Sequence, residues 1–223
     1  MTPSQTGRTV IVSDVDGTLI RPSSLIDLMS FDAHERGVVD EARACVERVQ
    51  AARRRGLPRS QTAEVLIQWW ADREIDDVDA LARRWAAANV ADRERFWHER
   101  VVAEVHRQVA KSGARLVLVS ASFAAPLRPL AAILGADEVV CSELTVVGGR
   151  YTGDISSLML GEAKAAAVTS LCSGAAVSMG YGDHLSDFPM LEITDIATVV
   201  AAQGVTSVEV EQGRRRGWRV LHS

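Results

Sequence analysis

The pattern of hydrophobic positions divides the chain into three stretches of different character. Residues 8–13 form a short apolar run with the length and β-branched content of a buried strand. From about residue 21 to residue 95, apolar positions recur at helical spacing, with almost no glycine and no good strand candidate. From about residue 96 onward, helical and strand-like patterns alternate. The middle stretch therefore predicts three to five helices inserted after the first strand.

The alternating stretch predicts a parallel sheet covered by helices on both faces. We expect an α/β fold in which residues 1–20 and 96–223 build a Rossmann-like core and residues 21–95 form a separate all-helical unit. The expected elements after residue 95 are a helix over 96–113, a strand over 115–122, a helix over 126–136, a β-hairpin over 137–155, a helix over 161–172, a strand over 175–183, a short helix over 186–194 and strands over 196–200 and 218–221.

Composition and charge narrow the class of protein. The chain has 223 residues, is 47% hydrophobic and carries a net charge of −4, which fits a globular protein with a sizeable core. A mild acidic excess gives no reason to expect nucleic acid or an anionic membrane as a partner. "MTPSQTGR" at the start has no apolar leader, no run reaches transmembrane length, and the cysteines are odd in number and widely spaced. We therefore expect a cytoplasmic protein.

Polar side chains gather where the predicted parallel strands end. In such sheets, ligands bind beyond the carboxyl ends of the strands. The residues expected at that edge are Asp14 and Asp16 after the first strand, Ser120 at the end of the second, Asp183 and Asp187 after the strand over 175–183, and Lys164 near the start of the preceding helix. Converging carboxylates cannot all stay ionised without a cation, and all-oxygen ligands with open positions favour Mg²⁺.

A magnesium ion beside a lysine and hydroxyl groups is suited to phosphoryl chemistry. Asp14 could attack phosphorus to form an aspartyl-phosphate, and Asp16 could protonate the leaving oxygen and later activate water. Gly17 would let the backbone turn tightly around a phosphate. Taken singly, the Asp-x-Asp pair is more often a turn or helix cap and Lys164 a solvated residue. Their joint placement favours a catalytic site.

Four segments in order resemble the motifs of the haloacid dehalogenase superfamily of aspartyl-phosphate hydrolases: "DVDGT", "LVLVSAS", "GEAKAAA" and "GYGDHLSDFPML". The helical stretch over 21–95 resembles the cap of the phosphoserine-phosphatase-like branch. The resemblance implies a Mg²⁺-dependent phosphatase with Asp14 as nucleophile and Asp16 as acid/base. It further implies phosphate binding by Thr18, Ser120, Ala121 and Lys164, and a metal held by Asp14, Asp16, Asp183 and Asp187.

The substrate is less well defined than the reaction. Phosphoserine phosphatases carry a glutamate where this chain has Ser23, and their carboxylate-binding arginine motif has no clear counterpart, so phosphoserine is not the preferred substrate. We expect a small phosphorylated metabolite, with specificity set by residues drawn from Arg21, Ser23, Ser24, Asp27 and Arg59. The sequence leaves the oligomeric state open.

The motif residues also bear on three alternative functions. Dehalogenases of the superfamily lack the second aspartate, so Asp16 disfavours carbon–halogen hydrolysis. A phosphotransferase or phosphomutase would use the same aspartyl-phosphate, and the sequence does not separate it from a phosphatase. A non-catalytic binding module is disfavoured because every ionisable motif residue is present.

Some residues have both a structural and a functional interpretation. We interpret the arginines from Arg53 to Arg55 as compensation of a helix dipole rather than an anion site. Trp69, Trp70 and Trp85 are expected in the core of the helical stretch, with an aromatic box for a cationic group as the alternative. His184 and Ser186 are expected to shape the loop of the fourth motif.

Overall fold

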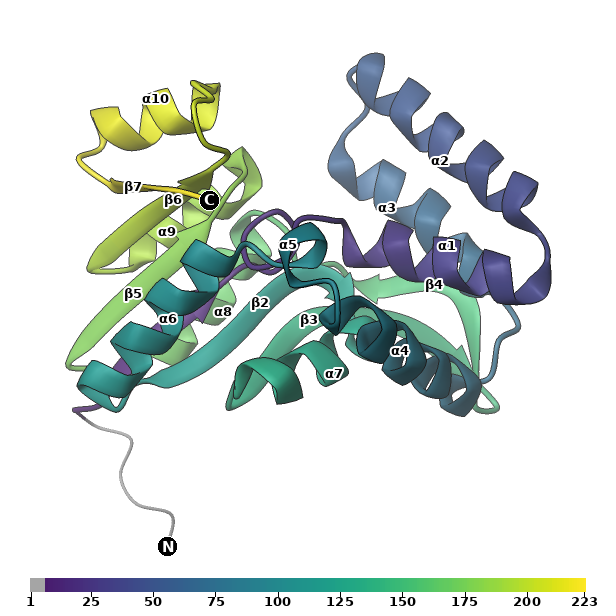
Figure 1. Ribbon diagram of the computed structural model, residues 1–223, viewed down its shortest axis with the longest axis horizontal. Coiled ribbons are helices and arrows are strands. Elements are labelled where there is room, and N and C mark those ends of the chain that lie inside the picture. The colour runs from purple at the N-terminus through teal and green to yellow at the C-terminus, as the bar shows by residue number, and fades with distance from the viewer. Residues whose placement is uncertain (1–6) are drawn as a thin grey trace, which may run out of the picture.

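A computed structural model describes residues 7–223 of the chain, so the expectation about the leader segment lies largely outside the described residues. The centre of the molecule is a seven-stranded sheet in the order β4-β3-β2-β1-β5-β6-β7, in which only β4 runs antiparallel to its neighbour (Figure 1). The strands are β1 Thr9–Ser13, β2 Arg115–Phe123, β3 Glu138–Val147, β4 Arg150–Ser157, β5 Val177–Gly182, β6 Ile196–Ala201 and β7 Arg219–His222.

Helices cover both faces of the sheet, as the sequence predicts. Helices α6 (Glu99–Ser112) and α7 (Ala124–Leu134) lie on one face, and α8 (Glu162–Cys172) and α9 (Phe188–Ile193) on the other (Figure 1). Alternate residues of β1 point to opposite faces: Ile11 joins the apolar cluster under α6 and α7, whereas Val10 and Val12 join the cluster under α8 and α9. Each such buried side chain contributes about 1.5–3 kcal/mol. The expected α/β fold is confirmed.

The direction of chain connection reverses at β1. This strand pairs with β2 on one side and with β5 on the other, and the backbone N–H of Asp14 donates to the carbonyl of Tyr181 at 2.9 Å. Connections that leave in opposite directions open a crevice at the carboxyl ends of the two strands. Asp14 and Asp183, the residues that follow β1 and β5, are thereby placed on the crevice.

The stretch between β1 and α6 is helical. It contains α1 (Ser24–Arg36), α2 (Val39–Arg54), α3 (Arg59–Ile67), the 3₁₀ turn η1 (Gln68–Trp70), α4 (Ile75–Val90) and the short α5 (Arg93–Phe96). As predicted, Gly56 follows the end of α2 in a left-handed conformation, with φ of +80°, and Pro58 precedes α3. Helices α1 to α4 stand at the β3–β4 end of the sheet (Figure 1).

These helices share one apolar cluster with the sheet. Trp70 is fully buried with its ring centroid 5.6 Å from that of Phe123, which in turn lies 5.8 Å from Tyr151. Trp85 is also fully buried and belongs to the same cluster. Trp69 is partly buried, and its Nε1 donates to Asp32 at 2.8 Å. The tryptophans therefore pack as core residues, which supports the structural interpretation over an aromatic box.

One helix was not predicted from the sequence. Helix α10 (Val208–Arg215) has few apolar residues and contains Gly213, which lowers helix propensity. That glycine is required by packing, because a Cβ at this position would lie 2.6 Å from Cγ2 of Val199. Tertiary contact thus overrides local preference. Across residues 7–223, every helix is too short or too polar to cross a membrane.

Candidate active site

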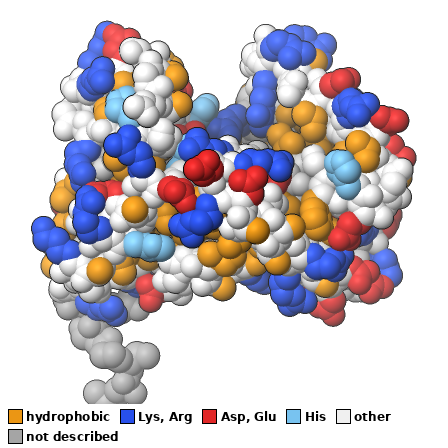
Figure 2. Space-filling model, viewed as in Figure 1, with side chains coloured by type: hydrophobic (Ala, Val, Ile, Leu, Met, Phe, Trp, Pro, Cys, Tyr) orange, Lys and Arg blue, Asp and Glu red, His pale blue; other side chains and the backbone are white. Residues whose placement is uncertain are grey.

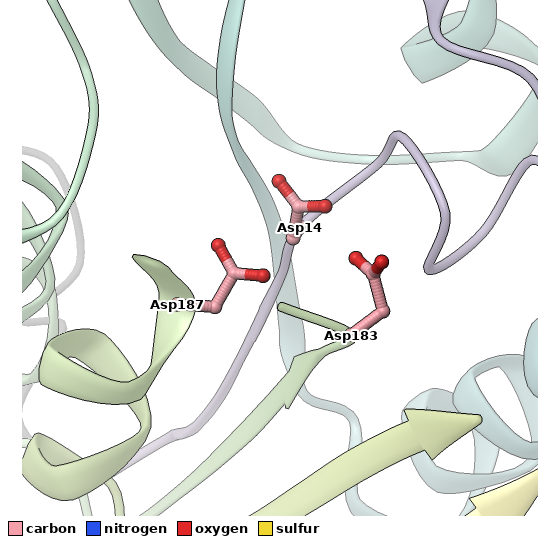
Figure 3. Close-up of side chains that lie close together, drawn as sticks. All are labelled: Asp14, Asp183 and Asp187. Atoms are coloured by element: carbon pink, nitrogen blue, oxygen red, sulfur yellow. The ribbon is translucent and has the colours of Figure 1, made fainter. Parts of the chain in front are cut away.

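Three carboxylates from separate parts of the chain converge at the crevice (Figure 3). Asp14 follows β1, Asp183 follows β5, and Asp187 closes the 3₁₀ turn η2 (Leu185–Asp187). One oxygen of each lies within 4.8 Å of the others. Asp14 and Asp187 are almost fully buried. Three of the four carboxylates predicted at this edge of the sheet therefore lie together, and Asp16 is not among them.

Lys164 joins two of these carboxylates. Its Nζ lies 2.5 Å from Asp14 Oδ1 and 2.7 Å from Asp187 Oδ1, and the residue is 1% exposed. Burial by itself would lower the pKa of this amine, but the carboxylates of Asp14 and Asp187 outweigh burial and raise the pKa above its usual value. Lys164 therefore stays protonated and provides a fixed positive charge beside Asp14.

Gly17 and Thr18 hold the third carboxylate against the first-motif loop. Gly17 has a φ of +84°, and a Cβ there would lie 2.4 Å from Oδ2 of Asp183. The hydroxyl of Thr18 is 3.0 Å from Asp183 Oδ1 and 3.3 Å from Asp14 Oδ2. Thr18 is fully buried between the two carboxylates. In this position it orients the carboxylates and does not line the pocket.

Burial and mutual repulsion raise the pKa values of two carboxylates of the cluster. Burial raises the pKa of Asp14 well above its ordinary value, with Lys164 opposing the effect. Burial, followed by repulsion from Asp187, raises the pKa of Asp183 to about 7. A divalent cation would relieve this repulsion, and an all-oxygen donor set is the one that Mg²⁺ prefers. The residues present therefore fit a hard divalent metal.

Asp16 is set apart from the cluster by the start of α1. Its Oδ2 accepts hydrogen bonds from the N–H of Ser24 at 3.0 Å, the hydroxyl of Ser24 at 3.1 Å and the hydroxyl of Ser23 at 3.3 Å. Its Oδ1 is buried without a hydrogen-bond partner among residues 7–223. Burial raises the pKa of Asp16, and the bonds from Ser24 oppose the rise.

The pocket beside these carboxylates lies between the sheet edge and the helical stretch. It is lined by most of the predicted residues together with several that were not predicted: Asp14, Asp16, Ser23, Leu25, Arg53, Arg59, Ala63, Leu66, Ser120, Ala121, Ser122, Leu158, Leu160, Lys164, Ser186 and Asp187. Figure 2 shows a hollow between the lobe that carries α10 and the lobe that carries α2 and α3, with basic side chains on its wall. The residues predicted to bind phosphate (Ser120, Ala121 and Lys164) therefore line the same cavity as Ser23 and Arg59, which were predicted to set specificity.

Three of the predicted specificity residues, Arg21, Ser24 and Asp27, do not line this pocket. Ser24 is fully buried, and its hydroxyl contacts Asp16 and Ser122. The guanidinium of Arg21 donates to the carbonyl of Glu94 at 2.9 Å, and Arg21 lines a separate depression with Glu94 and Arg100. Asp27 accepts a hydrogen bond from Nε1 of Trp85 at 2.8 Å. It points into the helical stretch because α1 turns this position toward α4. Arg21 and Asp27 therefore lie away from a substrate bound in this pocket.

Arg53 is the charged pocket residue that sequence reasoning missed. It was interpreted as compensation of a helix dipole, and it does lie in the last turn of α2. However, it also lines the pocket, as does Arg59 at the start of α3. Burial, and then the charge of Arg59, lower the pKa of Arg53. The sequence signal for this placement was the short α2–α3 connection with Gly56 and Pro58, which brings the end of α2 close to the start of α3.

The fourth-motif loop is shaped as expected. His184 Nδ1 accepts from the N–H of Ser186 at 3.0 Å, and the His184 N–H donates to Asp187 Oδ2 at 3.2 Å. The hydroxyl of Ser186 also lies 3.0 Å from the same imidazole nitrogen. These bonds fix Asp187 beside Lys164, while Ser186 additionally lines the pocket.

The fold and the site together define an α/β protein with a carboxylate–lysine centre at the carboxyl ends of β1 and β5. Residues 11–192 match the family of haloacid dehalogenase-like hydrolases, and the chain belongs to that family. The membership expected from the four motifs is confirmed. Among solved structures, a protein of unknown function from Bordetella pertussis Tohama I superposes with a TM-score of 0.82 at 23% identity, covering 97% of this chain and 99% of that one.

A phosphoserine phosphatase with a phospho-aspartyl intermediate analogue superposes with a TM-score of 0.65 at 19% identity, over 97% of this chain and 93% of that one. At this identity the likeness establishes the shared fold. By sequence, a probable phosphatase of Mycobacterium tuberculosis is 34% identical over 113 residues, which are 49% of this chain and 38% of the relative. The match therefore spans well under half of that curated relative. An inhibition of morphological differentiation protein of Streptomyces azureus is 27% identical, over 96% of this chain and 78% of that protein.

Proposed function

We propose that this protein is a Mg²⁺-dependent phosphatase that hydrolyses a small phosphomonoester through an aspartyl-phosphate. The observation that carries the proposal is the position of Asp14, which lines the pocket together with Lys164. One of its carboxylate oxygens lies 2.5 Å from Lys164 Nζ, and the other lies 3.3 Å from Oγ1 of the buried Thr18. The family membership and the name of the mycobacterial relative support a phosphatase.

The chain's own residues divide the reaction between them. Asp14 attacks phosphorus, while the ammonium of Lys164 and the hydroxyl of Ser120 hold the phosphoryl oxygens. Asp16 donates a proton to the leaving oxygen and then takes a proton from the attacking water. A Mg²⁺ ion held by Asp14, Asp183 and the Asp16 backbone carbonyl, with Asp187 in support, would neutralise negative charge on the phosphoryl group.

Residues 21–95 act in this proposal as the cap, and residues 1–20 and 96–223 as the core. The cap supplies Ser23, Arg53 and Arg59 to the pocket, whereas the core supplies the carboxylates and Lys164. The guanidinium of Arg59 reaches across to the core, 3.4 Å from the hydroxyl of Ser186. A substrate bound between the two parts is shielded from water as the leaving group departs.

The cap arginines favour a leaving group that carries an anion. Arg53 and Arg59 line the same pocket, and neither forms an ion pair with a carboxylate among residues 7–223. No acidic side chain of the cap lines the pocket to hold an ammonium group. A phosphorylated acid without an amine therefore suits the pocket better than phosphoserine.

This preference is testable with a matched substrate pair. We expect Arg59→Gln to raise KM for 3-phosphoglycerate about tenfold or more, because a charge-assisted hydrogen bond is worth roughly 1.5–3 kcal/mol, with a much smaller change for glycerol 3-phosphate. Arg54→Gln, at the end of the preceding helix α2 and outside the pocket lining, is the control. Equal changes in KM for both substrates would show that Arg59 does not bind the carboxylate of 3-phosphoglycerate.

The proposed function is tested by measuring inorganic phosphate released from a panel of phosphorylated metabolites, with and without Mg²⁺. We expect turnover of p-nitrophenyl phosphate and of at least one metabolite, and loss of both when a chelator removes the metal. Mg²⁺ should also stabilise the fold, by about 2.7 kcal/mol at one hundred times its Kd. Undiminished turnover in chelator contradicts the metal dependence. Transfer of the phosphoryl group to a second alcohol in place of water identifies the phosphotransferase alternative.

A further inference from the structure

The hydroxyl of Ser24 connects the start of α1 to the end of β2. Its Oγ is 3.1 Å from Asp16 Oδ2 and 2.8 Å from Ser122 Oγ. Both serines are almost completely buried. A hydroxyl carries a single hydrogen, so when Ser24 donates to the carboxylate, the second bond must be donated by Ser122. The three residues then form a directed chain of hydrogen bonds that ends on Asp16.

This chain makes the two oxygens of Asp16 chemically different. Oδ2 accepts from the N–H and the hydroxyl of Ser24 and from the hydroxyl of Ser23. Oδ1 is buried but has no partner within the described part of the chain. Buried polar atoms are nearly always hydrogen-bonded, so this orphan oxygen marks a place where a bound group supplies the partner. Because Oδ2 is saturated with donors, a proton on this carboxyl group resides on Oδ1.

The same contacts tie Asp16 to the helical stretch. Ser23 occupies the N-cap position of α1 but makes no capping bond with its own side chain. The carboxylate of Asp16 instead receives the first free N–H of the helix, that of Ser24, at 3.0 Å. An anion at a helix N-terminus is stabilised by the orphan N–H groups and the helix dipole. The direction of the Asp16 side chain is therefore set by where α1 begins.

We infer that Ser24 is a positioning residue for proton transfer: it fixes Oδ2 of Asp16 against α1, so that Oδ1 presents the proton to the ester oxygen of the substrate. The inference rests on the proposed phosphatase function. As Asp14 forms a bond to phosphorus, the ester P–O bond breaks, and the proton on Asp16 Oδ1 moves to the departing oxygen to give the alcohol. Water then attacks phosphorus and gives its proton to Oδ1, which releases phosphate and restores Asp14.

A pair of substrates with similar shape tests this role. Phenyl phosphate has a more basic leaving oxygen than p-nitrophenyl phosphate and depends more on protonation. We expect Ser24→Ala to lower kcat/KM for phenyl phosphate about tenfold or more, a part of the total effect of a general acid, and to change kcat/KM for p-nitrophenyl phosphate much less. Ser24→Thr retains the hydroxyl and should restore most of the loss.

Two further variants keep the test decisive. Ser30→Ala removes a hydroxyl on the same helix that bonds only the carbonyl of Ile26 at 2.8 Å, and should leave both substrates unaffected. Ser122→Ala preserves the contact between Ser24 and Asp16 but removes the hydroxyl at the far end of the hydrogen-bond chain. It should shift the ratio of kcat/KM between the two substrates in the same direction as Ser24→Ala, and it replaces that variant as the test if Ser24→Ala does not fold.

The outcomes separate this inference from the proposed function. Equal losses for both substrates, or no loss, in a folded Ser24→Ala protein overturn the positioning role while wild-type turnover leaves the phosphatase assignment standing. Wild-type protein that hydrolyses neither these phosphates nor any of the metabolite panel overturns both.

Discussion

Asp14→Asn should abolish phosphate release, with kcat reduced at least about a thousandfold, as when other enzymes lose a nucleophile. The amide cannot attack phosphorus, and it also removes the charge that pairs with Lys164 at 2.5 Å. The measurement is inorganic phosphate under saturating substrate and Mg²⁺. Acid quenching after exposure to substrate labelled in the phosphoryl group should leave label on the wild-type protein and none on the variant.

Asp154→Asn is the matched control, because it makes the same chemical change at an exposed residue of β4 that does not line the pocket. It should keep wild-type turnover and labelling. Normal turnover by a folded Asp14→Asn protein would rule out the covalent route, whereas a thermal unfolding curve like that of the wild type shows that lost activity is not lost structure.

Lys164→Met should have the largest effect on stability. The methionine leaves the buried carboxylates of Asp14 and Asp187 without their cation, and removing one partner of a buried ion pair costs about 3–5 kcal/mol. We expect a lower free energy of unfolding in denaturant titrations without divalent ions, and partial recovery when Mg²⁺ is added. Turnover should fall at least about a hundredfold even with Mg²⁺, because a donor to the phosphoryl oxygens is lost.

The chain provides a direct control for this variant. Lys111 is its only other lysine and is exposed in the last turn of α6. Lys111→Met should change the free energy of unfolding by no more than about 0.5 kcal/mol and leave turnover intact. If Lys164→Met were no less stable than Lys111→Met, the view that this lysine holds the carboxylate cluster together would be wrong.

Much of the core followed from local patterns. The apolar run before Asp14, the strand before Ser120 and the turn residues Gly148 and Gly149 predict their elements, and the structure confirms β1, β2 and the β3–β4 hairpin. Helix α10 could not be found in this way, because the residue that it requires at position 213, a glycine, is one that local propensity disfavours.

The helical stretch was predicted as helical, but the directions of its side chains were not. Periodicity gives the faces of a helix without stating what each face meets. Arg53 was interpreted as part of a helix end and lines the pocket, whereas Asp27 was expected in the pocket and bonds Trp85. These differences arise because α2 and α3 turn back on each other, and α1 packs against α4.

By itself the sequence determined the fold class, the polar residues that follow each predicted strand, and membership of the hydrolase family. The fold class follows from strand and helix periodicity, which is a local property, whereas the family follows from the resemblance of four motifs. Only the tertiary structure decided which oxygen of Asp16 is tied down, which arginines face the carboxylates, and that Thr18 lies behind the pocket. Those outcomes depend on contacts between segments distant in the chain, such as Ser24 with Ser122, whose geometry is fixed only when the segments pack.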